Sequence, residues 1–307
     1  MLRWLVPAAV VGFLAATVAA VALTSGGDGI DERSERVAGL KGDATRGAYV
    51  ARLAGCIACH TDAKGGGGFL AGGAPLETPF GVFRAPNITQ HPEDGIGNWS
   101  AGDLARALTA GTAPNGDHYY PVLPYDSYHR MADQDIADLW EALKTVPPIA
   151  GKASGHELGF PFNQRVLMGA WKSLFLDSGP FEPEPERSDA WNRGAYLVTG
   201  PGHCGACHTP RNVLGAMDRE SWLEGGPNGP RGEKVPALTA KALKSAGWSE
   251  RDLIFGLKYG TTPTGDALGG SMGEVIRDGT RWFSDADLQA IATYLLGDER
   301  SPDKNLN

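Results

Sequence analysis

Two pentapeptides of the form Cys-x-x-Cys-His are the segments of this sequence best suited to chemistry. They occupy residues 56–60 and 204–208 and contain all 4 cysteines of the chain. A zinc site would need four ligands, and each segment offers only two cysteines and one histidine. A redox dithiol does not require the histidine, and a disulfide across two residues would constrain the unfolded chain little. The spacing is that of covalent haem c attachment, with the histidine as the proximal iron ligand.

The two pentapeptides lie within an internal duplication. Residues 45–61 match residues 192–209, and residues 98–117 match residues 247–266. Self-similarity at a fixed period indicates repeated structural units, each able to build one small domain. We therefore predict two units and two covalently attached haem c groups. The haem-binding residues predicted from the motifs are Cys56, Cys59, His60, Cys204, Cys207 and His208.

The matched segments carry the signals of short helices. Ser100 and Asp103 form a capping box, and Ser249 and Asp252 form another. Each unit should end with a further helix, at about 133–146 and at 284–296. No alternating run is long enough to predict a sheet, so the expected fold class is all-α.

The N-terminus is apolar without interruption over residues 4–23. This length can cross a bilayer as a helix, and it exceeds the usual core of a signal peptide. Arg3 precedes the run and acidic residues follow it, which places the body outside the cytoplasm. We expect a single-pass helix in the inner membrane with the haem domains on the periplasmic side. Cleavage after Ala20-Val21-Ala22 is the alternative.

The chain divides into six expected segments. They are a transmembrane anchor or signal peptide (1–24), a linker (25–43), a first unit (44–148), a bridge (149–187), a second unit (188–299) and a tail (300–307). The bridge contains a predicted helix at 162–176, whose apolar stripe should pack the two units together. The stripe consists of residues four positions apart, Phe162, Val166, Ala170 and Leu174. A docking face for another subunit is the other interpretation of this stripe. With a net charge of −8, the chain is a poor candidate for binding nucleic acid.

The sixth iron ligand decides what a haem can do. Met131 and Met272 lie at matching places, between a Gly-Asp turn (Asp117 and Asp266) and the last helix of their unit. Methionine opposite histidine raises the iron potential, which suits electron transfer. His129 is the competing ligand in the first unit, but the second unit has no histidine at that place. Arg211, three residues after the second histidine, is suited to bind a haem propionate, and Arg84 is a further candidate.

Several longer segments resemble the multihaem cytochrome c subunits of bacterial membrane-bound dehydrogenases, including the alcohol and gluconate dehydrogenase types. The segments that carry this resemblance are "FRAPNIT" (83–89), "GIGNWS" (95–100), "YYPVLPYDSYHRM" (119–131), "NRGAYLV" (192–198) and "GHCGACHTPRN" (202–212). The resemblance implies two tandem class I cytochrome c domains with Met131 and Met272 as axial ligands. It also implies electrons taken from a dehydrogenase subunit and passed to a quinone, a soluble cytochrome or a terminal oxidase. The best-known members carry three haem motifs, whereas this chain has two.

Three functions remain open on the sequence. The expected one is an electron relay that is not itself an enzyme, because the haems supply the chemistry and the protein sets their potential and access. A dihaem cytochrome c peroxidase is the main alternative, and it would need one haem with an open or displaceable distal ligand. A purely structural haem-carrying subunit is the third.

Overall fold

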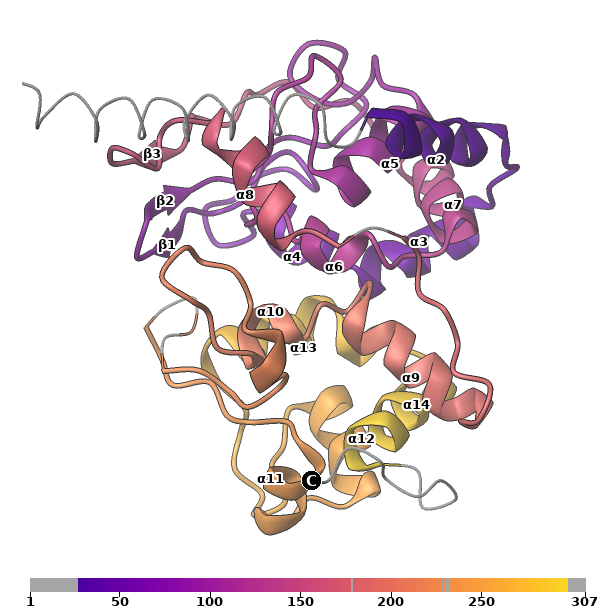
Figure 1. The fold of residues 1–307 in the computed structure, drawn as a ribbon, viewed down its shortest axis with the longest axis vertical. Helices are drawn as coiled ribbons and strands as arrows, with labels where there is room; N and C mark the ends of the chain where they lie inside the picture. The colour runs from indigo at the N-terminus through magenta and orange to yellow at the C-terminus, as the bar shows by residue number, and fades with distance from the viewer. Residues whose placement is uncertain (1–26, 178, 228, 230–231, 298–307) are drawn as a thin grey trace, which may run out of the picture.

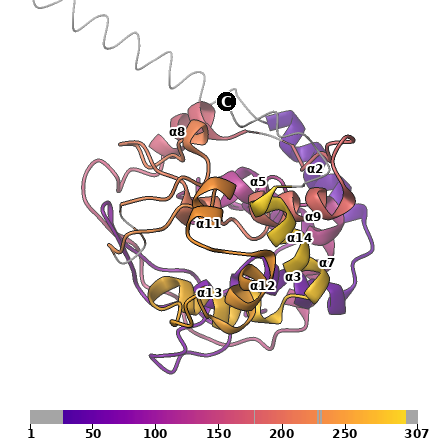
Figure 2. The same cartoon turned by 90° about the horizontal axis from the view of Figure 1, so that it is seen from below.

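A computed structural model describes residues 27–177, 179–227, 229 and 232–297. Two helical units lie one above the other (Figure 1), and seen from below the second unit overlies the first (Figure 2). The first unit contains α3 (Ala44–Leu53), α4 (Cys56–His60), α5 (Ala101–Ala110), α6 (Tyr125–Tyr128) and α7 (Asp133–Lys144). The second contains α9 (Asp189–Thr199), α10 (Gly205–His208), η2 (Arg219–Ser221), α11 (Ala240–Ser245), α12 (Glu250–Tyr259), α13 (Gly270–Asp278), η3 (Thr280–Trp282) and α14 (Asp285–Leu296).

Both predicted capping boxes are confirmed. The Ser100 hydroxyl accepts the Asp103 N–H at 3.1 Å at the start of α5, and Ser249 and Asp252 repeat this at the start of α12, at 3.2 Å. The aspartate carboxylate of each box accepts the N–H of its serine in return. These reciprocal bonds satisfy N–H groups that a helix start leaves unpaired. Helices α5 and α7 of the first unit correspond to α12 and α14 of the second, whereas η2 and α11 precede α12 without a helical counterpart in the described first unit.

The first and last helices of each unit cross at a glycine. A Cβ atom on Gly47 of α3 would lie 1.8 Å from the Asp138 carbonyl oxygen of α7. A Cβ atom on Gly194 of α9 would lie 2.0 Å from the Ala290 carbonyl oxygen of α14. Glycine is therefore required at both crossings because any side chain would push the helix backbones apart.

Replacing Gly47 or Gly194 by alanine should destabilise its unit by about 1–3 kcal/mol, because overpacking forces backbone shifts. Chemical denaturation followed by circular dichroism measures this loss. Gly155→Ala is the control, since a Cβ atom there meets nothing within 4 Å. This control should change the stability by less than about 0.5 kcal/mol. Equal stability of all three variants and the parent would contradict the crossing.

The predicted all-α fold class is wrong. A small antiparallel sheet joins β1 (Leu76–Thr78), β2 (Gly81–Phe83) and β3 (Glu157–Leu158), in that order. Its strands have only two or three residues, too few to show an alternating pattern. The transmembrane helix predicted at residues 1–24 lies outside the described residues, and no helix within the described part is long and apolar enough to cross a membrane. The fold class is thus corrected to helical with a small antiparallel sheet.

Two helices outside the repeated segments, α2 (Gly27–Gly39) and α8 (Leu167–Phe175), pack against the units. Helix α2 was not among the predicted helices, and it lies against α5 and α7 of the first unit. The bridge helix is α8, shorter than predicted, and its apolar stripe is not the packed face, since Val166 and Leu174 are exposed. Trp171 packs instead, against Tyr125 of the first unit and Ala216 of the second. Helix α8 therefore touches both units through a different side than the sequence suggested.

Candidate haem sites

Each attachment motif forms a short helix that ends at its histidine. His60 closes α4, and its Nδ1 lies 2.7 Å from the Pro86 carbonyl oxygen. His208 closes α10, and its Nδ1 lies 2.8 Å from the Pro236 carbonyl oxygen. A carbonyl only accepts, so Nδ1 carries the proton in both rings and Nε2 keeps its lone pair for a metal. Both histidines are thus held in the tautomer that an iron ligand needs.

Burial favours the neutral forms of the two histidines and of the neighbouring cysteines. Burial lowers the pKa of His60 and of His208, with the hydrogen bonds to the proline carbonyls acting in the opposite direction. Neutral imidazole is the form that ligates iron. Burial also raises the pKa of the Cys56 and Cys204 thiols to about 12. These cysteines therefore lack the thiolate character of reactive redox dithiols.

The loop after each histidine is closed by the same pair of hydrogen bonds. The Thr61 hydroxyl accepts the Leu70 N–H at 3.0 Å, and the Leu70 carbonyl accepts the Ile88 N–H at 2.9 Å. The second unit repeats both contacts. The Thr209 hydroxyl accepts the Leu223 N–H at 3.1 Å, and the Leu223 carbonyl accepts the Leu238 N–H at 2.8 Å. Leu70 and Leu223 have left-handed backbones, with φ of 58° and 59°. A bulky residue adopts this conformation only when its surroundings enforce it, so the loop geometry is built in twice.

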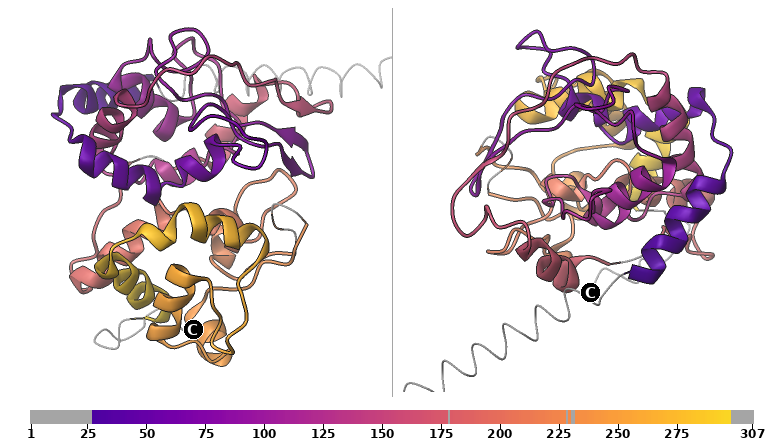
Figure 3. Two further views of the ribbon diagram at one scale, coloured as in Figure 1. Left: turned by 180° about the vertical axis from the view of Figure 1, so that it is seen from behind. Right: turned by 90° about the horizontal axis from the view of Figure 1, so that it is seen from above.

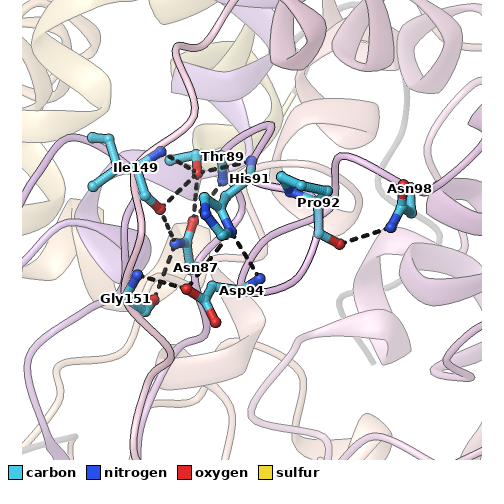
Figure 4. Close-up of polar contacts among 8 residues, drawn as sticks. All are labelled: Asn87, Thr89, His91, Pro92, Asp94, Asn98, Ile149 and Gly151. Carbon is cyan, nitrogen blue, oxygen red and sulfur yellow. Dashed lines mark hydrogen bonds and ion pairs between the residues drawn. The ribbon is translucent and has the colours of Figure 1, made fainter.

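A buried polar network holds the Pro86 segment in the first unit (Figure 4). The Asn87 side chain donates to the Ile149 carbonyl at 2.7 Å and accepts from the Thr89 hydroxyl at 2.8 Å. The Gly151 N–H donates to Asp94 at 2.9 Å, which ties the chain after α7 to the same loop. Asn87 and Thr89 are almost fully buried. This network fixes the carbonyl that orients His60.

The two prolines were missed by the sequence analysis. Their signal was present, because Pro86-Asn87-Ile88-Thr89 and Pro236-Ala237-Leu238-Thr239 match at an offset close to that of the cysteines. The chemistry lies in a backbone carbonyl, which residue type alone does not reveal. Only the fold shows that this carbonyl faces the histidine.

The two predicted methionine ligands differ in their surroundings. Met131 is fully buried and belongs to the first unit's core, against which Cys56 and Ile57 also pack. Met272 is half-buried on α13, and among the described residues it is not part of a core cluster. His129 is buried, and burial lowers its pKa to about 4. The assignment of Met131 and Met272 as axial ligands stays a prediction.

Arg33 of α2 fastens the segment that carries Met131. Its guanidinium donates to the His129 carbonyl at 2.6 Å and to the Met131 carbonyl at 2.5 Å. It also pairs with Asp133 at 2.7 Å, and its side chain is only 8% exposed. The duplication does not include Arg33, so the second unit holds Met272 without this clamp.

Replacing Arg33 by methionine should therefore loosen Met131 and lower the reduction potential of the first unit's haem. The substitution leaves two buried carbonyls without a donor, at a cost of about 1–3 kcal/mol each. Arg36→Met is the matched control, because Arg36 is exposed and, within the described part of the chain, pairs with Asp133 alone, at 3.2 Å. A redox titration should show a shift for the first variant alone, and equal titrations would contradict the clamp.

The described residues fit covalently bound haem. All four thiols are free, and no group of three or more His, Cys, Asp or Glu side chains in the described part could hold a metal ion, so zinc lacks its donor set. Arg84 pairs with Glu157 at 2.8 Å through one nitrogen, while its buried Nη1 has no hydrogen-bond partner in the described part. Such a donor suits a propionate carboxylate.

Arg211 is arranged differently from what the sequence suggested. Its guanidinium donates to the carbonyls of Ala206 and Gly215, at 2.9 and 2.5 Å, and so closes the loop after the second motif. Its contact with a propionate stays a prediction.

Two histidines held in the tautomer that can bind a metal, each beside a pair of free thiols, form the arrangement expected of a c-type cytochrome. The chain is 45% identical over 269 residues to a dihaem c-type cytochrome of Cereibacter sphaeroides, which covers 85% of this chain and 88% of that protein. It is 42% identical over 258 residues to a nicotinate dehydrogenase subunit of Pseudomonas putida, and the match covers 84% of this chain and 21% of that subunit. It is 38% identical over 254 residues to the fructose dehydrogenase cytochrome subunit of Gluconobacter japonicus, and the match covers 82% of this chain and 51% of that subunit. No protein-family model matches the chain.

The chain belongs to the family of dihaem c-type cytochromes and dehydrogenase cytochrome c subunits. The resemblance stated from the sequence is confirmed, and haem c is its cofactor. The chain is an electron-transfer cytochrome and not a catalytic subunit. It spans nearly all of the dihaem relative, but about half of the fructose dehydrogenase subunit and about a fifth of the nicotinate dehydrogenase subunit.

Proposed function

We propose that the chain binds two haem c groups and relays electrons between a dehydrogenase subunit and a quinone, a soluble cytochrome or a terminal oxidase. The observation that carries this proposal is the pair of matched His–Pro contacts, His60 to Pro86 and His208 to Pro236. Both units prepare their histidine in the same way, so both are suited to hold iron. A protein with a single functional haem would not require the second His–Pro contact.

The roles of the residues follow from this arrangement. Cys56 and Cys59 would bind one haem and Cys204 and Cys207 the other, through thioether bonds. His60 with Met131, and His208 with Met272, would complete the two iron coordination spheres. When bound, each haem supplies a one-electron couple whose potential depends on its axial ligands and on burial. The protein orients the imidazoles through the proline carbonyls and surrounds them with apolar side chains.

The proposed partner is a dehydrogenase subunit. Relatives named as subunits of nicotinate and fructose dehydrogenases support this partner class. The proposed location of the haem domains is the periplasmic side. The apolar run at residues 4–23, followed by acidic residues, supports export of the body.

The relay can be tested with purified, chemically reduced protein. Stopped-flow mixing with a ferric soluble cytochrome c, and separately with a water-soluble ubiquinone analogue, should show rapid oxidation by at least one acceptor. The Cys204→Ala, Cys207→Ala variant is the control for passage through the second unit. Oxidation by hydrogen peroxide alone, with neither acceptor reduced, would contradict the relay and favour a peroxidase.

A further inference from the structure

Two tyrosine side chains cross from one unit into the other. Tyr49 of α3 donates its hydroxyl to Asp287 of α14 at 2.7 Å and accepts the Ser284 N–H at 2.9 Å. Tyr196 of α9 donates its hydroxyl to the Asp135 carboxylate of α7 and accepts the Ala132 N–H at 3.2 Å. Each unit thus lends one hydroxyl to the start of the other unit's last helix.

The two cross-unit tyrosine contacts involve residues at equivalent positions of the duplicated segments. Both tyrosines end an Arg-Gly-Ala-Tyr segment, and both aspartates stand at the third position of the last helix of their unit. A carboxylate in the first helical turn is favoured by the helix dipole. The backbone N–H groups of Ala132 and Ser284, the residues just before α7 and α14, each donate to the tyrosine hydroxyl of the other unit. The same atoms therefore pair in both directions across the interface.

The contact is buried and directional. Tyr196 is 8% exposed, and Leu53 of the first unit lies in the core cluster of the second. The Tyr49 ring packs edge-on against Phe283, with centroids 6.4 Å apart. Apolar packing alone would allow the units to slide or rotate. The hydrogen bonds are directional, because each tyrosine hydroxyl must meet both a carboxylate and a backbone N–H of the other unit. Asp287 also pairs with Arg193, and Asp135 is half-buried, so the tyrosines contribute to one preferred orientation of the units.

The haem-attachment motifs meet at this same interface. Gly55 and His203 immediately precede Cys56 and Cys204, and a Cβ atom on Gly55 would lie 3.3 Å from the His203 Cε1 atom. Helix α13 packs against α4, and Lys64 pairs with Glu274 at 2.8 Å across the same junction. Seen from behind, the early helices of the first unit lie directly above the last helices of the second (Figure 3). The placement of one unit on the other therefore also sets the placement of one motif relative to the other.

We infer that Tyr49 and Tyr196 are positioning residues that fix the placement of one haem-attachment motif relative to the other. Through that placement they set the rate at which a single electron passes between the two irons, one being oxidised as the other is reduced. The inference rests on the proposed two-haem relay. The two tyrosine hydroxyls would thus influence the rate of electron transfer between the irons. In the described structure they do so without contacting the cysteines or the histidine of either attachment motif.

The test is the Tyr49→Phe, Tyr196→Phe double variant of the haem-loaded chain. Tyr125→Phe is the matched control, because the Tyr125 hydroxyl donates to the Tyr119 carbonyl at 3.2 Å within the first unit. The first readout is the magnetic interaction between the two ferric irons in the EPR spectrum of the oxidised protein. The second is the rate of internal electron exchange after partial reduction by a laser flash.

The double variant should retain both haems, lose most of the magnetic interaction and exchange electrons at least about tenfold more slowly, because reactions between fixed groups are sensitive to small misplacements. The control should match the parent in both readouts. An unchanged magnetic interaction in the double variant, or an equal loss in the control, would overturn the inference. A parent that shows the interaction but exchanges no electron would contradict the proposed relay instead, and the interaction would still test the placement.

Discussion

A chain in which alanine replaces both Cys56 and Cys59 is expected to carry one covalent haem in place of two. The thiols provide the only covalent attachment in the first unit, and Cys204 and Cys207 remain for the second. The first unit should also lose much of its stability, because the haem is the large apolar body around which a unit of this size closes. Haem content per chain, measured as the pyridine haemochrome after acid extraction of loose haem, should fall by half.

The reciprocal change serves as its control. Alanine at Cys204 and Cys207 should again leave one covalent haem, held now in the first unit. The two variants should differ in the reduction potential of the haem that remains, since Met131 and Met272 lie in different surroundings. If either variant kept both haems, or lost both, the assignment of one haem to each motif would be contradicted.

The second large effect is expected at the axial methionines. Met131→Leu removes the thioether while keeping a similar apolar volume, so ligation is separated from packing. The potential of the first haem should fall by roughly 0.1–0.2 V, within the range of about 0.8 V that axial ligands span. Met272→Leu should do the same to the second haem and leave the first nearly unchanged. An optical redox titration resolves the two steps.

Met168→Leu is the control for these variants. Met168 lies on α8, outside the repeated segments, and packs against the cluster that contains Trp171. Its replacement should leave both potentials where they are. Potentials that stay constant in both axial variants would contradict the ligand assignment and return attention to His129.

Much of the site could be predicted from local sequence. The Cys-x-x-Cys-His spacing and the serine-aspartate capping boxes each depend on residues within a few positions of one another, and the duplication appears as the same short segments written twice, so the sequence displays all three directly. The Arg-Gly-Ala-Tyr match was visible as well, but its meaning was not. Gly47 and Gly194 prove to be helix crossings, and Tyr49 and Tyr196 reach across the interface.

The features that were missed depend on contacts between distant residues. The carbonyls of Pro86 and Pro236 act through the backbone, and Arg33 reaches the Met131 segment across nearly a hundred positions. Strands of two or three residues leave no periodic pattern to detect. The bridge stripe misled because four-residue spacing marks one face of a helix without showing which face is buried. Trp171 forms the packed face, and Val166 and Leu174 face solvent.

The most direct test of the account is an EPR and optical redox titration of the purified, fully oxidised protein, repeated in the presence of hydrogen peroxide. The account predicts two low-spin haems with histidine and methionine ligands, titrating at two distinct potentials and unchanged by peroxide. A high-spin haem, or one that becomes high-spin on half-reduction and then reacts with peroxide, would contradict the electron relay and identify a peroxidase.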